Sequence, residues 1–389
     1  MTPTAAAHTD LDFWRKEFPS VASCVYMISH SLGAMPRRVR QRLDEYAETW
    51  ERRGIRAWEE GWWEMPVTVG NLLGEILGAP PGSITMHQNV AIAEAVVISC
   101  FDFRSRRNKV VYTDMNFPSV MYAYEAQRRN GARIEMVSSD DGISAPIERL
   151  LDAIDEETLL VPISHVLFRS SFIQDVEAIV QRAHSVGAHV VLDIYHSAGT
   201  LPLNLTQLGV SFAVGGSVKW LCGGPGAGYL YVRPDLAGRL QPALTGWMAH
   251  QHPFDFEIGA IQYAPDAFRF LNGTPHIPAL YAARSGYEII REIGVPAIRA
   301  KSQRQTERMI AWADEFGFTV RSPRNPEHRA GSVVIDVPAG DRVCRELILR
   351  NFLVDYRPEA GIRMAPHFYN TDEEVDAVMR ETRRIVAGE

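Results

Sequence analysis

Residues 158–193 read TLLVPISHVLFRSSFIQDVEAIVQRAHSVGAHVVLD, and this stretch decides the fold of the chain. It begins with an apolar run at 158–164, continues with a helical pattern at 174–186, and ends with a second apolar run at 188–193. Both apolar runs are continuous rather than alternating, which is typical of strands that are covered on both faces. The stretch therefore predicts two parallel strands joined by a helix.

The same alternation of strands and helices continues on both sides of this stretch. Strands are expected at 83–86, 109–114 and 133–138, and a further apolar segment lies at 210–216. Helices are expected after Pro36, after Pro66, and at 89–101, 118–129 and 147–154. The alternation predicts an α/β fold with a mainly parallel sheet between helices. In such sheets a ligand binds at the carboxyl ends of the strands.

The pattern changes beyond Pro253, where a loop rich in proline, glycine and aromatic residues leads into a long helix near Pro278. A smaller α/β unit follows, with strands near 332–337, 352–356 and 361–365 and a last helix that starts at a capping box of Thr371 and Glu374. We therefore expect three parts: an N-terminal segment, 1–35, that packs on the small domain and active site, a large domain, 36–275, and a small C-terminal domain, 276–389.

Composition excludes several classes of partner. The 389 residues are 46% hydrophobic and 22% charged, as in ordinary globular proteins, and the net charge of -7 argues against a nucleic-acid or membrane-surface partner. No apolar run is as long as a membrane span, and no export signal is visible at the start. We expect a cytoplasmic protein whose four cysteines, Cys24, Cys100, Cys222 and Cys344, are reduced thiols and which has no metal site.

One lysine stands out. Only four of the 40 basic residues are lysines, and Lys16, Lys109 and Lys301 lie in polar, arginine-containing surroundings that predict a solvated surface. Lys219 instead lies between small and apolar residues, in GGSVKWLCGG. An amine can lose its proton and attack a carbonyl, whereas a guanidinium remains charged. Lys219 is therefore either a nucleophile or a buried lysine paired with a carboxylate.

The residues before Lys219 favour the nucleophile. Asp193 ends the strand at 188–193, with His196 three residues later, and Lys219 follows the next apolar segment. Alone, Asp193 is interpreted as a cap for the following segment. An amine and a buried carboxylate on neighbouring strand ends are what pyridoxal 5'-phosphate requires, with lysine forming a Schiff base and the carboxylate keeping the pyridine nitrogen protonated.

Other segments offer the remaining contacts of that cofactor. The backbone N–H groups around Asn89 and Val90 precede a helix and would face a phosphate, although a plain asparagine N-cap explains the same pattern. Phe117 would stack on the cofactor ring or belong to the core, and Ser217 would donate to the phosphate. The glycine-rich GGPGAG after Lys219 is not a Walker A sequence, because no Gly-Lys-Ser/Thr follows.

These residues resemble the fold-type I pyridoxal-phosphate enzymes of the class V aminotransferase superfamily, and within it the kynureninase branch. The resemblance runs over nearly the whole chain and is carried by YMISHSLGAMP, FPSVMYAYEAQ, PISHVLF, LDIYHSAG, GSVKWL, PALTGWMAH and GIRMAPHFYN. It implies a large domain with a mainly parallel seven-stranded sheet and a smaller C-terminal α/β domain. It also implies a homodimer with shared active sites.

The resemblance also implies roles for single residues. Phe117 would stack on the ring, Ser164 would lie near the cofactor, Asp193 would contact the pyridine nitrogen, and His196 would contact the 3'-oxygen or phosphate. Lys219 would carry the Schiff base, and Arg363 would grip the substrate α-carboxylate. Trp247 would reach the phosphate region of the partner subunit. The remaining expected site residues are Thr274 for the cofactor and Ser31, His30 and Arg169 for the substrate.

The chain departs from the kynureninase pattern at several positions. Val218, Val120, Val90 and His30 stand where that branch usually has Tyr, Asp, Thr and Asn, and a histidine that binds the aromatic end of kynurenine is missing near RRGIRAW. The cofactor assignment does not depend on these positions, but the reaction does. Arg169 either forms a salt bridge at the domain surface or binds a second acidic group of the substrate.

The leading hypothesis is an amino-acid-transforming enzyme, with hydrolytic Cβ–Cγ cleavage as the first expectation. Transamination and decarboxylation coupled to oxidative deamination are alternatives. Cysteine desulfuration is disfavoured because no cysteine lies clearly in a mobile active-site loop. A binding protein that kept the fold without catalysis would be expected to have lost Lys219, Asp193 or Arg363, and all three are present.

Overall fold

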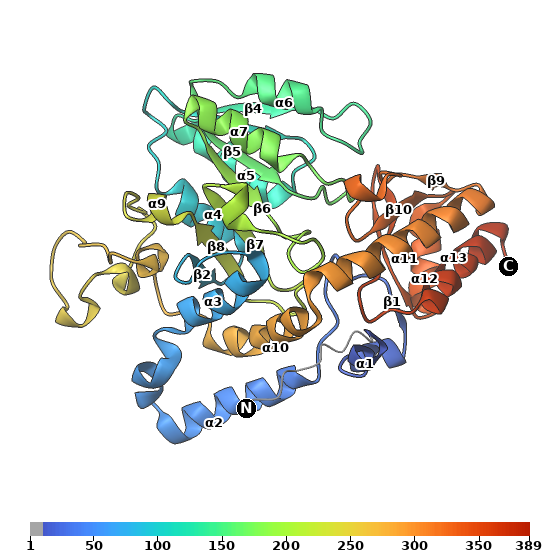
Figure 1. Cartoon of the computed structure of the whole chain (residues 1–389), viewed down its shortest axis with the longest axis horizontal. Helices are drawn as coiled ribbons and strands as arrows, with labels where there is room; N and C mark the ends of the chain where they lie inside the picture. Colours follow the sequence, from blue (N-terminus) through green and yellow to red (C-terminus); the bar gives the residue numbers. More distant parts are fainter. Residues whose placement is uncertain (1–10) are drawn as a thin grey trace.

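A seven-stranded sheet forms the centre of the larger part of the computed structural model, which describes residues 11–389 (Figure 1). Its strands lie in the order β2-β8-β7-β6-β5-β3-β4, and β8 runs antiparallel to both of its neighbours while the other pairs are parallel. The strands are β2 (Ile84–His87), β3 (Lys109–Thr113), β4 (Arg133–Val137), β5 (Thr158–Ser164), β6 (His189–Asp193), β7 (Phe212–Gly216) and β8 (Gly228–Val232). The expected mainly parallel, seven-stranded sheet is confirmed.

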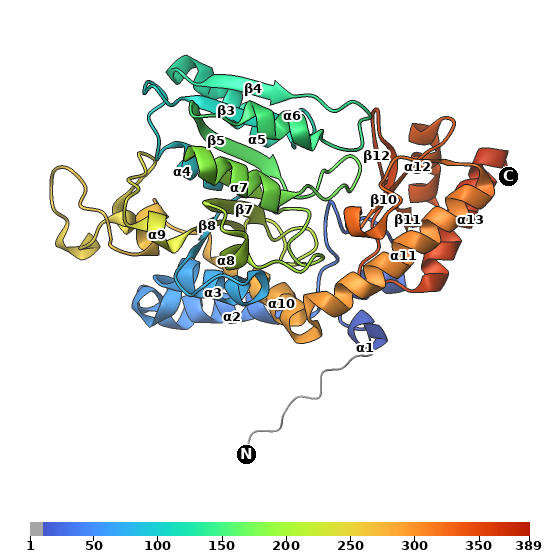
Figure 2. The same cartoon turned by 45° about the horizontal axis from the view of Figure 1, so that its top comes forward.

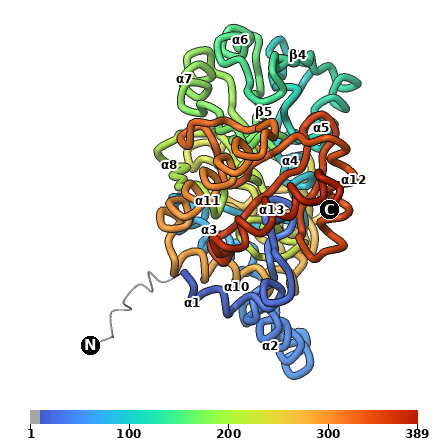
Figure 3. Tube along the Cα trace, turned by 90° about the vertical axis from the view of Figure 1, so that its right-hand side faces the viewer, coloured from blue at the N-terminus to red at the C-terminus, as the bar shows by residue number. Residues whose placement is uncertain are grey.

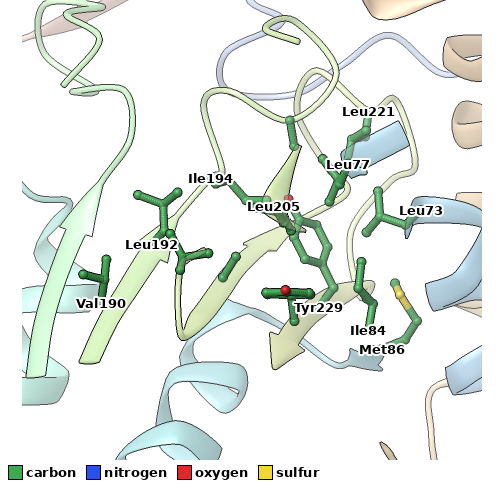
Figure 4. Packing of buried hydrophobic residues seen from close by; sticks show 14 of the residues in the cluster. Leu73, Leu77, Ile84, Met86, Val190, Leu192, Ile194, Leu205, Leu221 and Tyr229 are labelled. Atoms are coloured by element: carbon green, nitrogen blue, oxygen red, sulfur yellow. The ribbon is translucent and has the colours of Figure 1, made fainter. Parts of the chain in front are cut away.

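The apolar runs are continuous because both faces of the sheet are buried. Val190 and Leu192 of β6 pack with α3 residues in one core cluster, shown in Figure 4, while Val191 between them belongs to the cluster on the other face. The helices of this part are α2 (Arg38–Arg53), α3 (Met65–Leu77), α4 (Val90–Ile98), α5 (Pro118–Glu125), α6 (Ile147–Ala153), α7 (Val176–Val186), α8 (Leu205–Leu208), α9 (Pro234–Ala237) and α10 (Ile277–Ile293).

The smaller unit is built on a four-stranded antiparallel sheet in the order β12-β13-β10-β9. Its elements are α11 (Val295–Phe316), β9 (Thr319–Val320), β10 (Val333–Asp336), α12 (Gly340–Leu349), β11 (Phe352–Leu353), β12 (Asp355–Arg357), β13 (Gly361–Met364) and α13 (Asp372–Ala387). Figure 3 looks onto this unit from the side of α11 and α13. The capping box of Thr371 and Glu374 is present at the start of α13.

The N-terminal segment reaches the small unit. It begins with α1 (Leu11–Arg15), and β1 (Val25–Tyr26) pairs in parallel with β11. The first ten residues of the expected segment 1–35 lie outside the described residues. The small C-terminal domain is expected to begin at residue 276. The helix that follows, α10, packs against α2 and α3 of the large part (Figure 2). The long helical region therefore divides at Gly294, between α10 and α11.

Two of the lysines expected on the surface are buried, so that expectation is wrong. Lys109 is 7% exposed and its Nζ lies 2.7 Å from Asp155 and 3.1 Å from Glu135, and Lys301 is 6% exposed and donates to the carbonyl of Phe368 at 2.8 Å. A lysine stem can lie in apolar surroundings while its ammonium finds polar partners, so polar sequence neighbours do not decide burial. Lys109 is thus a buried lysine paired with carboxylates. This is the arrangement that the sequence left open as an alternative for Lys219.

Strand β8 was not predicted, because the sequence was interpreted only as a tight turn after Lys219. All five residues of β8 are buried between β2 and β7. In the part of the chain from residue 11 onward, no helix is long and apolar enough to cross a membrane. The four cysteines are free thiols.

Candidate active site

Lys219 follows the carboxyl end of β7 and lies beside residues that follow β6. Its Nζ is 2.7 Å from Nε2 of His196 and lies over the ring of Tyr195, 4.2 Å from the centroid. The ring of Phe117, which precedes α5, is 5.5 Å from the same nitrogen. Among the described residues, no carboxylate forms an ion pair with this amine, in contrast to Lys109. The lysine therefore faces a histidine and two aromatic rings.

The surroundings of Lys219 favour its neutral amine. Burial lowers the pKa of Lys219 to about 7, with the positive charges of Arg363 and Arg357 acting in the same direction and Asp193 and Asp355 opposing them. Burial together with the charge of Lys219 holds the pKa of His196 well below its ordinary value, so this imidazole is neutral. A substantial fraction of Lys219 is thus an unprotonated nucleophile near neutral pH, a state that arginine cannot reach.

Asp193 occupies the end of β6, and its two carboxylate oxygens accept hydrogen bonds from different partners. Its Oδ1 accepts a hydrogen bond of 2.9 Å from the backbone N–H of Tyr195, which is the capping role. Its Oδ2 accepts one of 3.3 Å from Ser164, which ends the neighbouring strand β5. Burial raises the pKa of Asp193, while the Tyr195 N–H, Lys219 and Ser164 oppose that shift. The carboxylate is therefore buried, fixed in place and electrostatically coupled to Lys219.

Arg363 on β13 is held by a carboxylate that the sequence interpretation missed. Its Nε and Nη2 donate to the two oxygens of Asp355 at 2.7 and 2.5 Å, and Nη1 donates to the carbonyl of Phe168 at 2.8 Å. Asp355 and Arg363 are directly opposite each other in the antiparallel pair of β12 and β13. The sequence contained a signal for this pair, because two short strands joined by a tight turn place residues such as Asp355 and Arg363 opposite each other.

The expected substrate residues His30 and Ser31 belong to the same cluster. His30 Nε2 lies 3.0 Å from Asp355 Oδ1, and Ser31 Oγ donates to Asp355 Oδ2 at 2.8 Å. Arg363 Nη2 also donates to Ser31 at 3.2 Å. Burial and the charge of Arg363 lower the pKa of His30 to about 4. The structure thus brings the N-terminal segment and the small unit together beside Lys219.

Arg169 lies farther out. Its Nη1 is 3.2 Å from the exposed carboxylate of Glu359, and its guanidinium lies 5.7 Å from the ring centroid of Phe168. Phe168 in turn meets Phe117 edge-to-face, with ring centroids 5.2 Å apart. The ion pair with Glu359 agrees with the salt bridge that was one interpretation of Arg169.

The residues expected to contact the phosphate differ in whether they have a free hydrogen-bond donor. Asn89 is the N-cap of α4, and its side chain accepts a hydrogen bond from Ile92, which is the plain capping explanation. Val90 is the first residue of that helix, so backbone N–H groups are its available donors. Ser217 donates to the carbonyl of Ala227 at 2.6 Å and contacts the hydroxyl of Tyr287, so in this conformation it has no free donor.

Trp247 and Thr274 lie in another place. Both line a cavity of about 670 Å³ together with Trp58, Trp63 and Phe254, and the residues that line it do not include Lys219. Trp247 is 46% exposed, and its Nε1 donates to the carbonyl of Pro253. These two residues therefore do not join the Lys219 group within one chain.

The Lys219 group fits pyridoxal 5'-phosphate in the chemistry of its side chains. An amine whose pKa burial lowers can bind the aldehyde, a buried carboxylate is available for the ring nitrogen, and aromatic rings adjoin the amine. Tyr195, 4.2 Å from the amine, was quoted in the sequence motif but not recognised as a site residue. Over residues 11–389, no group of three His, Cys, Asp or Glu side chains is arranged to hold a metal ion.

Comparisons with known proteins agree with this site. Residues 25–378 match the family model described as aminotransferase class-V. The chain is 30% identical over 385 residues to the kynureninase of Bacillus thuringiensis subsp. konkukian (strain 97-27), covering 95% of this chain and 90% of that protein. It is also 30% identical over 362 residues to the uncharacterized aminotransferase YcbU of Bacillus subtilis (strain 168), covering 93% and 94%.

Solved structures share the fold at lower identity. The apo cysteine desulfurase from Thermococcus onnurineus NA1 superposes with a TM-score of 0.87 at 22% identity, covering 100% of both chains. The cystine C–S lyase C-DES, in complex with its product cysteine persulfide, gives 0.85 at 19% identity, covering 94% of this chain and 99% of that one. At these identities the likeness concerns the fold alone.

Proposed function

This chain belongs to the class V aminotransferase family and is a pyridoxal-phosphate-dependent enzyme, and we propose that it hydrolyses the Cβ–Cγ bond of a kynurenine-type amino acid. The observation that carries the proposal is the shared site of three groups: the buried amine of Lys219 with its lowered pKa, the buried carboxylate of Asp193 and the guanidinium of Arg363. Relatives called kynureninase that match 90% or more of their own length support the choice of reaction.

Each of the three groups has its own part in the reaction. Pyridoxal phosphate supplies an electron sink for a carbanion at the substrate's α-carbon. Lys219 would hold the aldehyde of the cofactor through its amine and would move the proton at the substrate's α-carbon. Asp193 would hold a proton at the ring nitrogen.

Arg363 would present its remaining Nη1 N–H to the substrate carboxylate, because Asp355, Ser31 and Phe168 already accept hydrogen bonds from its other N–H groups.

Transamination is the second candidate, and a specific observation favours it. Val218 precedes Lys219 and has no proton to give, and a relative of similar identity bears the name aminotransferase. Transamination needs only a proton shift between the α-carbon and the cofactor, which Lys219 can perform alone. Hydrolysis additionally needs water to attack the γ-carbonyl.

The deciding experiment follows the products. Purified protein with pyridoxal phosphate is mixed with L-kynurenine or 3-hydroxykynurenine, and the products are separated by chromatography. We expect alanine with anthranilate or 3-hydroxyanthranilate in equal amounts. Accumulation of pyridoxamine phosphate with a keto acid would establish the transaminase instead. A Lys219→Ala variant is the control for reactions in solution.

We also propose a homodimer in which Trp247 and Thr274 serve the site of the partner subunit. The proposal is supported by the exposed apolar residues at and near the cavity that they line, including Phe254, Phe256 and Ile258 in the adjoining loop. Light scattering of the purified protein should give twice the mass of one 43.6 kDa chain. A mass of one chain would refute the shared site.

A further inference from the structure

We propose that His30 is the acid–base residue for the water step of the hydrolysis, with Asp355 as its positioning residue. This inference rests on the proposed function and names the residue that performs its second proton transfer. His30 is 1% exposed, and its Nε2 lies 3.0 Å from Asp355. Its other nitrogen, Nδ1, is buried and has no hydrogen-bond partner among the residues that the structure describes.

Asp355 fixes which nitrogen carries the proton. Burial alone would raise the pKa of Asp355, but the hydrogen bonds from His30 and Arg363 hold it well below its ordinary value. An ionised carboxylate only accepts hydrogen bonds, so Nε2 of His30 must donate to it. A neutral imidazole that donates from Nε2 has a lone pair on Nδ1. The unpartnered nitrogen of His30 is thus a hydrogen-bond acceptor and a base.

The position of His30 suits a proton transfer beyond the α-carbon. It shares Asp355 with Arg363, the residue that would hold the substrate carboxylate, and the charge of Lys219 also affects its pKa. Val218 and Val120 carry no acid or base, and Nε2 of His196 contacts Lys219. His30 therefore offers this cluster an imidazole nitrogen that has no partner among the described residues.

Substrate binding would make this base stronger. Burial is the main cause of the low pKa of His30, but the positive charges of Arg363 and Lys219 contribute to it. A substrate carboxylate on Arg363 would offset the positive charge there and so weaken that contribution. The negative charge of Asp355 would then stabilise the imidazolium during the reaction.

The proposed step conserves atoms and electrons. An O–H bond of water breaks as its proton moves to Nδ1 of His30, and the oxygen forms a bond to Cγ. The Cβ–Cγ bond then breaks, its electron pair stays on Cβ, and Cβ takes the proton from His30. The hydroxyl remains on Cγ, so the products are a carboxylic acid and alanine.

The first test reads the proton position without measuring turnover. The holoenzyme labelled with ¹⁵N-histidine is studied by NMR at pH 7.5, and a His30→Asn sample assigns the signal. We expect a neutral ring with hydrogen on Nε2 and none on Nδ1. A ring protonated on Nδ1, or on both nitrogens, would overturn the proposal.

The second test separates the two proton transfers. For His30→Asn with L-kynurenine, we expect kcat to fall by about 10²–10⁴-fold, while exchange of the α-proton with D₂O stays within about threefold of wild type because Lys219 performs it. His189→Asn is the matched control, since His189 is another neutral histidine, at the opposite end of β6 from Asp193.

Each result of the second test has one meaning. If wild type cleaves L-kynurenine and His30→Asn cleaves it at a similar rate, or loses α-proton exchange to the same extent as cleavage, the role of His30 is refuted and the proposed function stands. If wild type releases no anthranilate, the proposed function fails and the role of His30 in it fails too.

Discussion

Asp355 and Arg363 face each other across β12 and β13, and the carboxylate takes both N–H groups on one side of the guanidinium, at 2.7 and 2.5 Å. Arg363 is consequently held in one orientation, with Phe168 fixing Nη1 and Ser31 fixing Nη2. Within residues 11–389, these contacts use four of the five guanidinium N–H groups and leave one on Nη1 for a substrate carboxylate. The pair therefore makes the orientation of Arg363, and not only its charge, a determinant of substrate binding.

Arg363→Lys tests this orientation. The ammonium keeps the charge but cannot bind Asp355 and a substrate carboxylate in the same plane. We expect KM to rise by about ten- to a hundredfold, as for the loss of a hydrogen bond to a charged group worth roughly 1.5–3 kcal/mol. Steady-state kinetics would measure it. Arg321→Lys is the control on the same small sheet, since its pair with Asp336 is exposed, and an equal effect there would contradict the prediction.

Lys219→Arg tests the need for a deprotonated amine. The variant keeps a positive charge but cannot bind an aldehyde covalently, so borohydride should fix no cofactor on that peptide in mass spectra. Turnover should fall by at least about 10²–10⁴-fold. Lys109→Arg is the matched control, because Lys109 is also buried but is paired with Asp155 and Glu135. Cofactor fixed to any other lysine would refute the assignment.

The pH dependence of cofactor capture follows from the same amine. Burial lowers the pKa of Lys219 to about 7, so its neutral fraction rises between pH 6 and 8 and is nearly complete above that range. The rate at which apoenzyme combines with pyridoxal phosphate should rise by about tenfold from pH 6 to 8 and then level off. A lysine with an ordinary pKa would give a rise of about a hundredfold that continues beyond pH 8. Stopped-flow absorbance distinguishes the two.

Glu94 on α4 should make the protein less stable at higher pH. Burial raises the pKa of Glu94 to about 8, and Tyr124 donates to its carboxyl group at 2.6 Å. Between about pH 4.5 and 8 the folded state keeps a proton that the unfolded state loses, so the free energy of unfolding falls by at most about 1.4 kcal/mol per pH unit from this group.

Glu94→Gln should remove that slope. Urea unfolding at pH 5 and 7.5 would show the variant gaining on wild type as the pH rises. The control is Glu125→Gln, because Glu125 also accepts a hydrogen bond from a tyrosine, Tyr112, but is exposed. Parallel curves for wild type and Glu94→Gln would show that Glu94 is ionised in the folded protein.

Sequence patterns predicted much of the large domain and part of the site. The strands were recognisable because residues such as Val190 and Val191 face opposite buried layers, which leaves a continuous apolar run. Strand β8 was missed because its position beside β2 and β7 depends on partners far away in the chain. The burial of Lys109 and Lys301 was missed for a similar reason.

The sequence by itself determined the order of strands and helices apart from β8, and the meeting of Asp193, His196 and Lys219, because the ends of neighbouring parallel strands share one edge. Only the tertiary structure decided that His30 meets Asp355, 325 residues away, and that Arg363 is already bound to a carboxylate. The physical reason is that apolar periodicity records which face of an element is buried. It does not record which distant loops and edge strands approach one another, and those contacts set the charges and free nitrogens of the site.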